Sequence, residues 1–293
     1  SLEALEILDA IARHGSFGRA AEELGRVPSS ITYAVRKLED DLDTLIFDRS
    51  GYRAELTPTG KVLLEQGRAL LQQADQLQSQ IAQAAKGWEL ELTIVLDAIL
   101  PWRWLQPHVE AYFRESCPAK LRINEETLAG SWESLLDGRA DLIIGATNDP
   151  PSGMGVSTQP LFNVPFSYCV SPMHPLSSAP EPISDDLLKS HRAIVLGDSA
   201  RRLPLRSSGL LSGQDTLVVP SMPAKVDAQI AGLGGGYLAN WFAAEHLRDG
   251  RLVSRQLQEP KPPGPTVLAW KSGNRGRALT WWRERLRDVR PPQ

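Results

Sequence analysis

The sequence has little cysteine, little net charge and no long hydrophobic run. Its two cysteines, Cys117 and Cys169, are too few for a disulfide framework and lack the spacing of zinc ligands, which favours a reducing compartment. The longest apolar runs, such as residues 92–100, fall far short of the about 20 residues that a membrane span needs. The N-terminus is charged within three residues and shows no secretory signal. We therefore expect a cytoplasmic protein with no membrane partner.

Motifs for catalysis, metals and cofactors are also scarce. The five histidines show no metal-ligand spacing, and the nucleophile motif G-x-S-x-G is absent. The glycine-rich run 232–236 is the best argument for a nucleotide-dependent enzyme, but it follows a predicted helix, whereas a phosphate-binding loop follows a strand. We therefore expect no enzymatic activity, no catalytic residue, no metal and no cofactor. A hydrolase or dehydrogenase is the enzymatic alternative.

The first 60 residues alternate short helical patterns with sharp breaks. A first apolar helical pattern stops at Gly15, and Ser16 can cap a second short helix. After the next turn, Pro28 suits the first position of a third helix. Residues 45–56 read as a short hairpin around a Ser-Gly turn, and residues 57–60 close the unit. These features predict a winged helix-turn-helix, in which the buried stripe of the third helix is Ile31, Val35, Leu38 and Leu42.

Residues 61–88 contain no proline and repeat small or apolar residues at alternating spacings of four and three. This heptad seam indicates a helix that pairs with a second copy as a coiled coil. The glutamine-rich flanks are too polar for wide burial, which favours intermolecular pairing, although Gly67 is a weak point in the seam. An amphipathic helix packed on its own domain is the alternative. The seam consists of Leu63, Gly67, Leu70, Ala74, Leu77, Ile81, Ala84 and Trp88.

From residue 89 onward the sequence alternates strand and helix patterns, which predicts an α/β domain with a mostly parallel sheet. Segments 162–166 and 259–265 read as crossings between two lobes with a cleft between them. The length of 293 residues suits about two domains. The predicted division is a winged helix-turn-helix at 1–60, a linker and dimerisation helix at 61–88, and a two-lobed domain at 89–293, with lobe I at about 89–163 and 266–293 and lobe II at about 164–265.

Segments 8–24, 29–39, 45–50 and 56–60 together resemble the DNA-binding segment of the LysR-type transcriptional regulators. The remainder is similar to that family in architecture, with a domain that resembles type II periplasmic binding proteins. The resemblance implies a winged helix-turn-helix, a dimerising linker helix and a hinged α/β domain that binds a small-molecule effector. It further implies a sequence-specific regulator that binds double-stranded operator DNA as a homodimer or homotetramer and has RNA polymerase as a partner.

The exposed side of the third helix is the expected DNA-reading surface, because a helix fits the major groove, where base edges differ. The family commonly has glutamine and arginine at the positions of Pro28 and Tyr33, so we expect an unusual operator preference. Residues 1–60 hold seven basic and eleven acidic residues, so basicity must come from placement, with residues 39–43 turned away from DNA. The predicted contacts are Pro28, Ser29, Ser30, Thr32, Tyr33, Arg36 and Lys37 in the helix, and Arg49 and Arg53 in the wing.

The effector is expected beyond the carboxyl ends of the strands, where ligands bind in open α/β sheets. The family commonly has a small hydroxyl residue at the position of Asp97, and a carboxylate there disfavours an anion and suits a phenolic hydroxyl or a cation. Together with aromatic walls from Trp102, Trp104, Phe166 and Tyr237, this favours an aromatic effector that changes lobe closure. These aromatic side chains can instead be part of the core. Each polar group can instead be a helix cap or a surface group. The predicted contacts are Asp97, Ile99, Trp102, Thr127, Ser199, Arg201, Ser221 and Met222.

Two further alternatives stay open. The N-terminal helical unit can serve protein contact only, attached to a solute-binding or enzymatic α/β domain. A cysteine redox switch is the other alternative, although no basic residue adjoins Cys117 or Cys169 in sequence to lower the thiol pKa.

Overall fold

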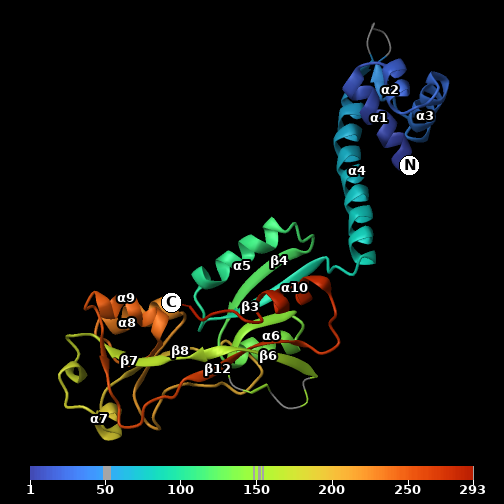
Figure 1. Cartoon of the computed structure of the whole chain (residues 1–293). Coiled ribbons are helices and arrows are strands. Elements are labelled where there is room, and N and C mark those ends of the chain that lie inside the picture. The colour runs from blue at the N-terminus through green and yellow to red at the C-terminus, as the bar shows by residue number, and fades with distance from the viewer. Residues whose placement is uncertain (49–53, 148, 151–152, 154, 293) are drawn as a thin grey trace. The chain divides into compact units, whose positions relative to one another are not determined.

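The structure is a computed structural model that describes residues 1–48, 54–147, 149–150, 153 and 155–292. The chain forms two compact units, Ser1–Lys86 and Gly87–Gln293 (Figure 1). Each unit has a hydrophobic core of its own. Among the described residues, no helix is both long and apolar enough to span a membrane.

The first unit begins with three short helices that follow the breaks in the sequence. The first ends at Gly15, whose φ of 62° lies in the left-handed region that glycine tolerates. The Ser16 side chain accepts a hydrogen bond from the Arg19 amide and caps the second helix, and Pro28 lies in the first turn of the third. These predicted helix boundaries are confirmed. The helices are α1 (Leu2–His14), α2 (Phe17–Glu23) and α3 (Pro28–Asp41).

The core of the first unit lies between these helices and includes most of the predicted stripe of α3. Ile31 and Val35 are buried, and Leu38 packs against them from a partly buried position. The prediction for Leu42 is wrong, because α3 ends at Asp41 and Leu42 is 48% exposed.

Glu39 is buried, unlike the exposed acidic residues Asp40, Asp41 and Asp43 that follow it on the chain. Its carboxylate accepts hydrogen bonds from the amides of Ile46 and Phe47 and so fixes the start of the wing to α3. The wing strands β1 (Phe47–Asp48) and β2 (Glu55–Leu56) pair antiparallel, as the predicted hairpin requires. Arg49 and Arg53 lie outside the described residues.

Helix α4 (Pro58–Ala85) has 28 residues and begins three residues before the predicted helix. The Thr57 side chain caps it by accepting a hydrogen bond from the Gly60 amide, so residues 57–60 start this helix instead of closing the winged unit. The helix ends before Trp88, which packs against the core of the second unit and so does not belong to the seam.

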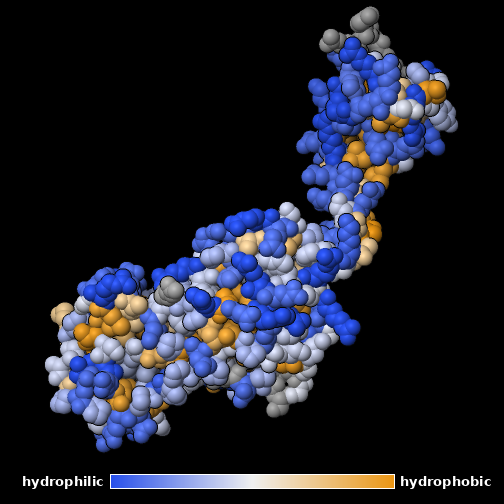
Figure 2. All heavy atoms as spheres, viewed as in Figure 1, coloured by the Kyte–Doolittle hydropathy of each residue, from blue (hydrophilic) through white to orange (hydrophobic). Residues whose placement is uncertain are grey.

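The start of α4 packs on α1. For this part of the helix, packing on its own domain is thus observed, which was the alternative to a coiled coil. Leu63 packs against the core of the first unit. A Cβ at Gly67 would lie 2.9 Å from Cδ2 of Leu5, so this glycine permits a close helix contact and is not a defect of the seam. Farther along, hydrophobic atoms stay at the surface of the helix (Figure 2), and the exposed seam residues there are Leu70, Leu77 and Ile81.

Lobe I of the second unit is built on a five-stranded sheet of order β4-β3-β5-β12-β6. Strand β3 pairs parallel with β4 and β5, whereas β12 pairs antiparallel with β5 and β6. The expected mostly parallel sheet is thus corrected to a mixed one, because β12 returns from lobe II in the opposite direction. The strands are β3 (Glu91–Asp97), β4 (Lys120–Glu126), β5 (Leu142–Thr147), β6 (Val156–Val164) and β12 (Gly264–Lys271).

Helices cover both faces of this sheet, as the alternation of buried side chains in β3 requires. Ile94 and its same-face neighbours share a core with Tyr112 and Trp282, whereas Val95 points to the other face and packs with Trp132. The helices are α5 (Trp102–Arg114) and α10 (Arg277–Arg285) on the first face and α6 (Ala129–Leu136) on the second.

Lobe II begins at Pro165, which separates β6 from β7 and lies inside the predicted crossing segment 162–166. The chain returns to lobe I between β11 and β12, a stretch that covers most of the predicted crossing segment 259–265. It contains an antiparallel sheet of order β10-β7-β11 and a parallel pair, β8 and β9. Strands β10 and β11 were not expected from the sequence. The elements are β7 (Phe166–Val170), α7 (Asp185–Lys189), β8 (Ala193–Leu196), β9 (Thr216–Val219), α8 (Met222–Ile230), β10 (Gly236–Ala239), α9 (Asn240–Arg248) and β11 (Val253–Arg255), with a 3₁₀ turn at Pro175–Ser177.

Candidate DNA-binding surface and effector cavity

The outer face of α3 presents polar side chains at the surface. The hydroxyls of Ser30 and Thr32 donate to the backbone carbonyls of Val27 and Pro28 at 2.8 and 3.0 Å, so they keep mainly acceptor capacity. Tyr33 is 70% exposed. The exposed side chains of this face that retain donors are Ser29, Tyr33, Arg36 and Lys37.

Charge in the first unit is distributed so that cations on α3 stay available. Arg13 pairs with Asp9 and Glu23, which neutralises part of the acidic excess away from α3. Arg36 and Lys37 are exposed, and neither forms an ion pair with any residue that the structure describes. An exposed helix face whose arginine and lysine are unpaired among the described residues suits contact with phosphates and with guanine edges.

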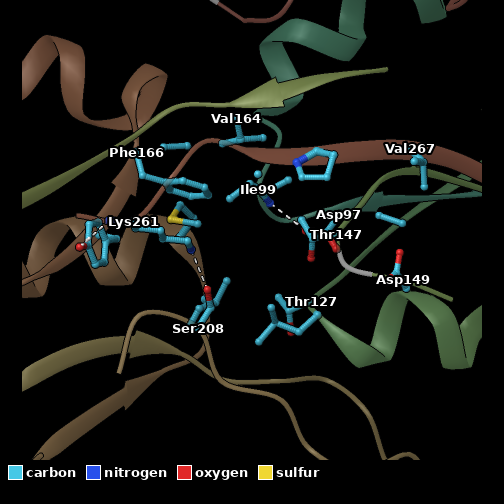
Figure 3. A pocket seen from close by; sticks show the side chains of 18 of the residues that line it. Asp97, Ile99, Thr127, Thr147, Asp149, Val164, Phe166, Ser208, Lys261 and Val267 are labelled. Carbon is cyan, nitrogen blue, oxygen red and sulfur yellow. Dashed lines mark hydrogen bonds between the residues drawn. The ribbon is translucent and has the colours of Figure 1, made fainter. Parts of the chain in front are cut away.

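A cavity of about 420 Å³ lies between the two lobes of the second unit (Figure 3). From lobe I it is lined by Asp97, Thr127 and Thr147, which lie at or just beyond the carboxyl ends of β3, β4 and β5. From lobe II it is lined by elements that include β7, α8 and β10. Its volume and mixed lining suit a small organic molecule with a few polar groups.

Four of the eight predicted effector contacts line this cavity, as do two of the predicted aromatic walls. The six residues are Asp97, Ile99, Thr127, Met222, Phe166 and Tyr237. These positions follow from the rule that ligands bind beyond the carboxyl ends of strands and from the crossing between the lobes.

The structure places the other predicted residues outside the lining. Trp102 is 51% exposed at the start of α5, and the indole of Trp104 donates to the Arg290 carbonyl at 2.8 Å. Ser221 caps α8 by accepting a hydrogen bond from the Ala224 amide. Ser199 and Arg201 belong to a contact between the lobes beside the cavity.

That contact joins the start of α6 in lobe I to the segment after β8 in lobe II. The Ser199 hydroxyl accepts a hydrogen bond from the Thr127 amide at 2.9 Å. The Asp198 carboxylate accepts hydrogen bonds from the Ala129 and Gly130 amides at 3.3 and 3.1 Å, and so caps a helix that lacks a cap of its own. Here Leu128, which lines the cavity, has a φ of 51°, a strained conformation for a residue with a side chain.

Glu133 of α6 strengthens the same contact from a buried position. Its carboxylate accepts hydrogen bonds from the amides of Leu203, Arg202 and Arg201 at 2.7 to 3.1 Å. These amides hold the pKa of Glu133 down to about 2. Arg201 therefore acts in this region through its backbone, while its side chain is exposed.

Asp97 is held within lobe I although it lines the cavity. Its carboxyl oxygens accept hydrogen bonds from the Ser131 hydroxyl at 2.8 Å and from the Ile99 amide at 3.1 Å. Burial raises its pKa to about 7, despite these two donors. Near neutral pH this group is thus only partly ionised, which weakens the expected exclusion of anions.

Two lysines line the cavity that were not predicted from the sequence, Lys225 on α8 and Lys261 before β12. The ammonium of Lys261 donates to the Ser208 hydroxyl at 2.7 Å and lies 3.8 Å from the centre of the Phe166 ring. Burial lowers the pKa of Lys225 to about 8. The available signal was a lysine on the apolar face of a predicted helix, three residues after Met222.

The two cysteines lack the features of reactive thiols. Burial raises the pKa of Cys169 to about 12, and it also raises the pKa of Cys117. A raised pKa removes the thiolate that oxidation requires, so the geometry does not favour a redox switch.

A winged helix-turn-helix unit, followed by two α/β lobes that enclose a cavity, defines a DNA-binding regulator with a ligand-binding domain. The family model for bacterial regulatory helix-turn-helix proteins of the lysR family matches residues 2–61, and the model for the LysR substrate binding domain matches residues 85–291. The chain belongs to the LysR family of transcriptional regulators.

Similar proteins agree with this assignment along nearly the whole chain. The uncharacterized regulator YeeY of Escherichia coli K12 is 38% identical over 285 residues, which cover 97% of this chain and 92% of that protein. The probable regulator YhaJ of the same organism is 37% identical over 283 residues, covering 96% and 94%. A cysteine mutant of OxyR from Corynebacterium glutamicum shares the fold, with a TM-score of 0.67 at 20% identity, over 97% of this chain and 90% of that one. The fold class and the family expected from the sequence are confirmed.

Proposed function

We propose that the regulator reads its operator through the exposed face of α3, with Arg36 as the main base-reading side chain. The observation that carries this proposal is an exposed arginine on that face that makes no ion pair with a described residue. A guanidinium can donate two hydrogen bonds to one guanine in the major groove. Ser29, Tyr33 and Lys37 complete the set of donors, and the wing residues Arg49 and Arg53 stay predicted phosphate or minor-groove contacts.

The proposed function of each part of the chain follows from its structure. The winged helix-turn-helix before α4 binds DNA, helix α4 pairs two copies, and the second unit binds the effector between its lobes. An effector in the cavity would contact both lobes, so its binding shifts lobe closure and thereby the spacing of the DNA-binding units in the oligomer. The aromatic side chains of Phe166 and Tyr237 in the lining favour an effector with an aromatic or apolar body.

The cellular setting in this proposal is the cytoplasm, where operator DNA is accessible. The proposal assigns no catalytic activity to the chain. Contact with RNA polymerase stays a prediction of the family resemblance.

The test compares Arg36→Ala with wild type in binding to operator fragments selected from random duplex DNA. Loss of a bidentate contact should weaken specific binding by about 10- to 100-fold and relax the preference at one base pair, with an unchanged circular dichroism spectrum. Arg122→Ala is the matched control, because Arg122 forms an exposed ion pair with Glu91 in lobe I, far along the chain from α3. Normal operator binding by Arg36→Ala would refute the assignment.

A further inference from the structure

Lys225 is a buried cation that faces the cavity and has no partner among the described residues. It is 7% exposed, and it forms no hydrogen bond or ion pair with any residue that the structure describes. A charge removed from water is costly unless it is paired, and buried lysines in proteins are therefore nearly always paired or serve a function. The ammonium of Lys225 is therefore expected to have a binding partner that enters the cavity.

The fold places this lysine at the cavity through the face of α8 that it occupies. Met222, Lys225 and Gln229 follow at spacings of three and four and lie on one buried side of the helix. A Cβ at Gly236 of β10 would lie 3.4 Å from Cε of Lys225 and 2.7 Å from Nε2 of Gln229, so glycine leaves room for both side chains. The amide atoms of Gln229 also lack partners among the described residues.

The charged and titratable groups around Lys225 do not neutralise it. On its own side of the cavity the neighbours are Lys261, which has the same charge, the buried thiol of Cys169, and the phenol of Tyr237. Burial raises the pKa of Tyr237, so this phenol stays neutral where Lys225 titrates. The lobe I lining holds Asp97 and Asp149, but neither forms an ion pair with either lysine in the described structure. Asp97 is already bound by Ser131 and Ile99.

We propose that Lys225 binds the acid group of the effector, and that the effector is a small organic acid with a single carboxylate and an apolar or aromatic body. This proposal rests on the proposed effector cavity. The carboxylate would supply the partner that the ammonium lacks, with Lys261 adding positive potential and the Phe166 and Tyr237 rings contacting the body. A carboxylate fits better than a dianion, because each further charge adds to the cost of leaving water.

This assignment reverses the expectation drawn from Asp97. The sequence indicated one carboxylate at the cavity, whereas the structure places two lysines in the lining as well and shows that Asp97 is hydrogen-bonded within lobe I. The hydrogen-bonded Asp97 then suits a hydroxyl group on the body of the acid.

The experiment uses the full chain and a panel of acid–amide pairs with different bodies, including benzoate with benzamide and salicylate with salicylamide. Isothermal calorimetry should show that an acid binds the wild type at least 10-fold more tightly than its amide. Lys225→Met should remove this preference and melt at a higher temperature than wild type without ligand, because it no longer buries an unpaired charge. The matched control is Lys189→Met, which replaces an exposed lysine of α7 and should keep the preference for acids over amides.

Proton uptake gives a second readout. Without ligand, the pKa of Lys225 is lowered to about 8. When an acid binds and pairs with the ammonium, Lys225 should therefore take up a proton between about pH 8 and 10. For the same reason, the acid should bind more weakly as the pH rises above 8. Lys225→Met should show no such uptake.

Three results would overturn the proposal: amides that bind as tightly as acids, a preference for acids that survives in Lys225→Met, or no acid in the panel that binds the wild type. The cavity itself is tested separately with Ile99→Trp, which fills the space. A neutral ligand that binds the wild type as tightly as any acid in the panel, but does not bind Ile99→Trp, would preserve the effector cavity while refuting its specificity for acids.

Discussion

At the scale of single residues, Asp97 links the effector cavity to the stability of lobe I. Its burial raises the pKa to about 7, well above the value of 3.8 for an unfolded chain. Between these two values the folded protein holds a proton that the unfolded chain releases. The stability contributed by the neutral carboxyl is therefore complete below about pH 4 and is lost as the pH rises toward 7.

Replacing Asp97 with asparagine should accordingly stabilise the effector domain at pH 8 and stabilise it much less at pH 4.5. The gain at pH 8 is at most about 4 kcal/mol, because a shift of one pKa unit corresponds to about 1.4 kcal/mol. Urea unfolding of wild type and Asp97→Asn at the two pH values measures it. Asp149→Asn changes an exposed carboxylate of the same cavity and should not alter the pH profile. An equal gain at both pH values would show that the buried charge is not the cause.

In the effector cavity, the sequence predicted a residue correctly only where the order of strands in the sheet was enough to place it. Asp97 and Thr127 follow predicted strands, so the edge of the sheet brings them to the cavity. Ser199 also follows a strand, but the segment after β8 folds onto α6 through Asp198, which no sequence pattern indicated. Lys225 was missed because a lysine on a helix is expected at the surface, and its burial depends on β10, a strand that was not predicted.

At the scale of elements, α4 is the part whose surface most needs a partner. Its start is anchored by Leu63 and Gly67 against the first unit. Beyond that anchor, Leu70, Leu77 and Ile81 are 51%, 57% and 61% exposed on one helix. A single helix with an exposed apolar seam at heptad spacing is stabilised when a second copy covers it.

The double substitution Leu70→Lys and Leu77→Lys should therefore lower the oligomer mass in sedimentation equilibrium. Four lysines would face one another across the seam of a dimer, and their repulsion adds to the lost apolar burial. Gln72→Lys with Gln76→Lys places the same charges on the polar flank of α4 and should leave the mass unchanged. If the first variant keeps the wild-type mass, another surface holds the oligomer together.

Boundaries of elements were predicted best where glycine, proline or a capping side chain interrupts the helical pattern. Gly15, Ser16 and Pro28 end or begin helices as expected. Heptad spacing could not show that Trp88 belongs to the next unit, because the spacing continues past the end of the helix at Ala85. The direction of β12 was also unpredictable, since strand patterns do not encode parallel or antiparallel pairing.

At the scale of the whole molecule, the two units have separate cores. The core of the first unit draws its residues from positions 5 to 64, and that of lobe I draws them from positions 88 to 289. Chain connectivity joins the units between Lys86 and Gly87. Each unit therefore buries its apolar side chains without the other, as independent folding requires.

The second unit begins with a short segment that belongs to its fold. The Glu89 carboxylate accepts hydrogen bonds from the amides of Ala278 and Leu279 at 2.8 and 3.1 Å, and so caps α10, whose own N-cap is Gly276. Trp88 lies beside it, with the Arg277 guanidinium 4.9 Å from the centre of its ring. The position at which the chain is cut thus decides how stable the isolated effector domain is.

A chain that begins at Gly87 should fold alone, melt in one cooperative transition and keep the ligand binding of the full protein while losing operator binding. A chain that begins at Leu90 lacks Trp88 and Glu89, so we expect it to be less stable by about 1–2 kcal/mol for the lost cap, with a further loss from the indole contacts. Thermal unfolding of both chains measures the difference. Equal stability would show that Glu89 does not support α10, whereas a Gly87 chain that fails to fold would mean that the effector domain depends on the DNA-binding unit.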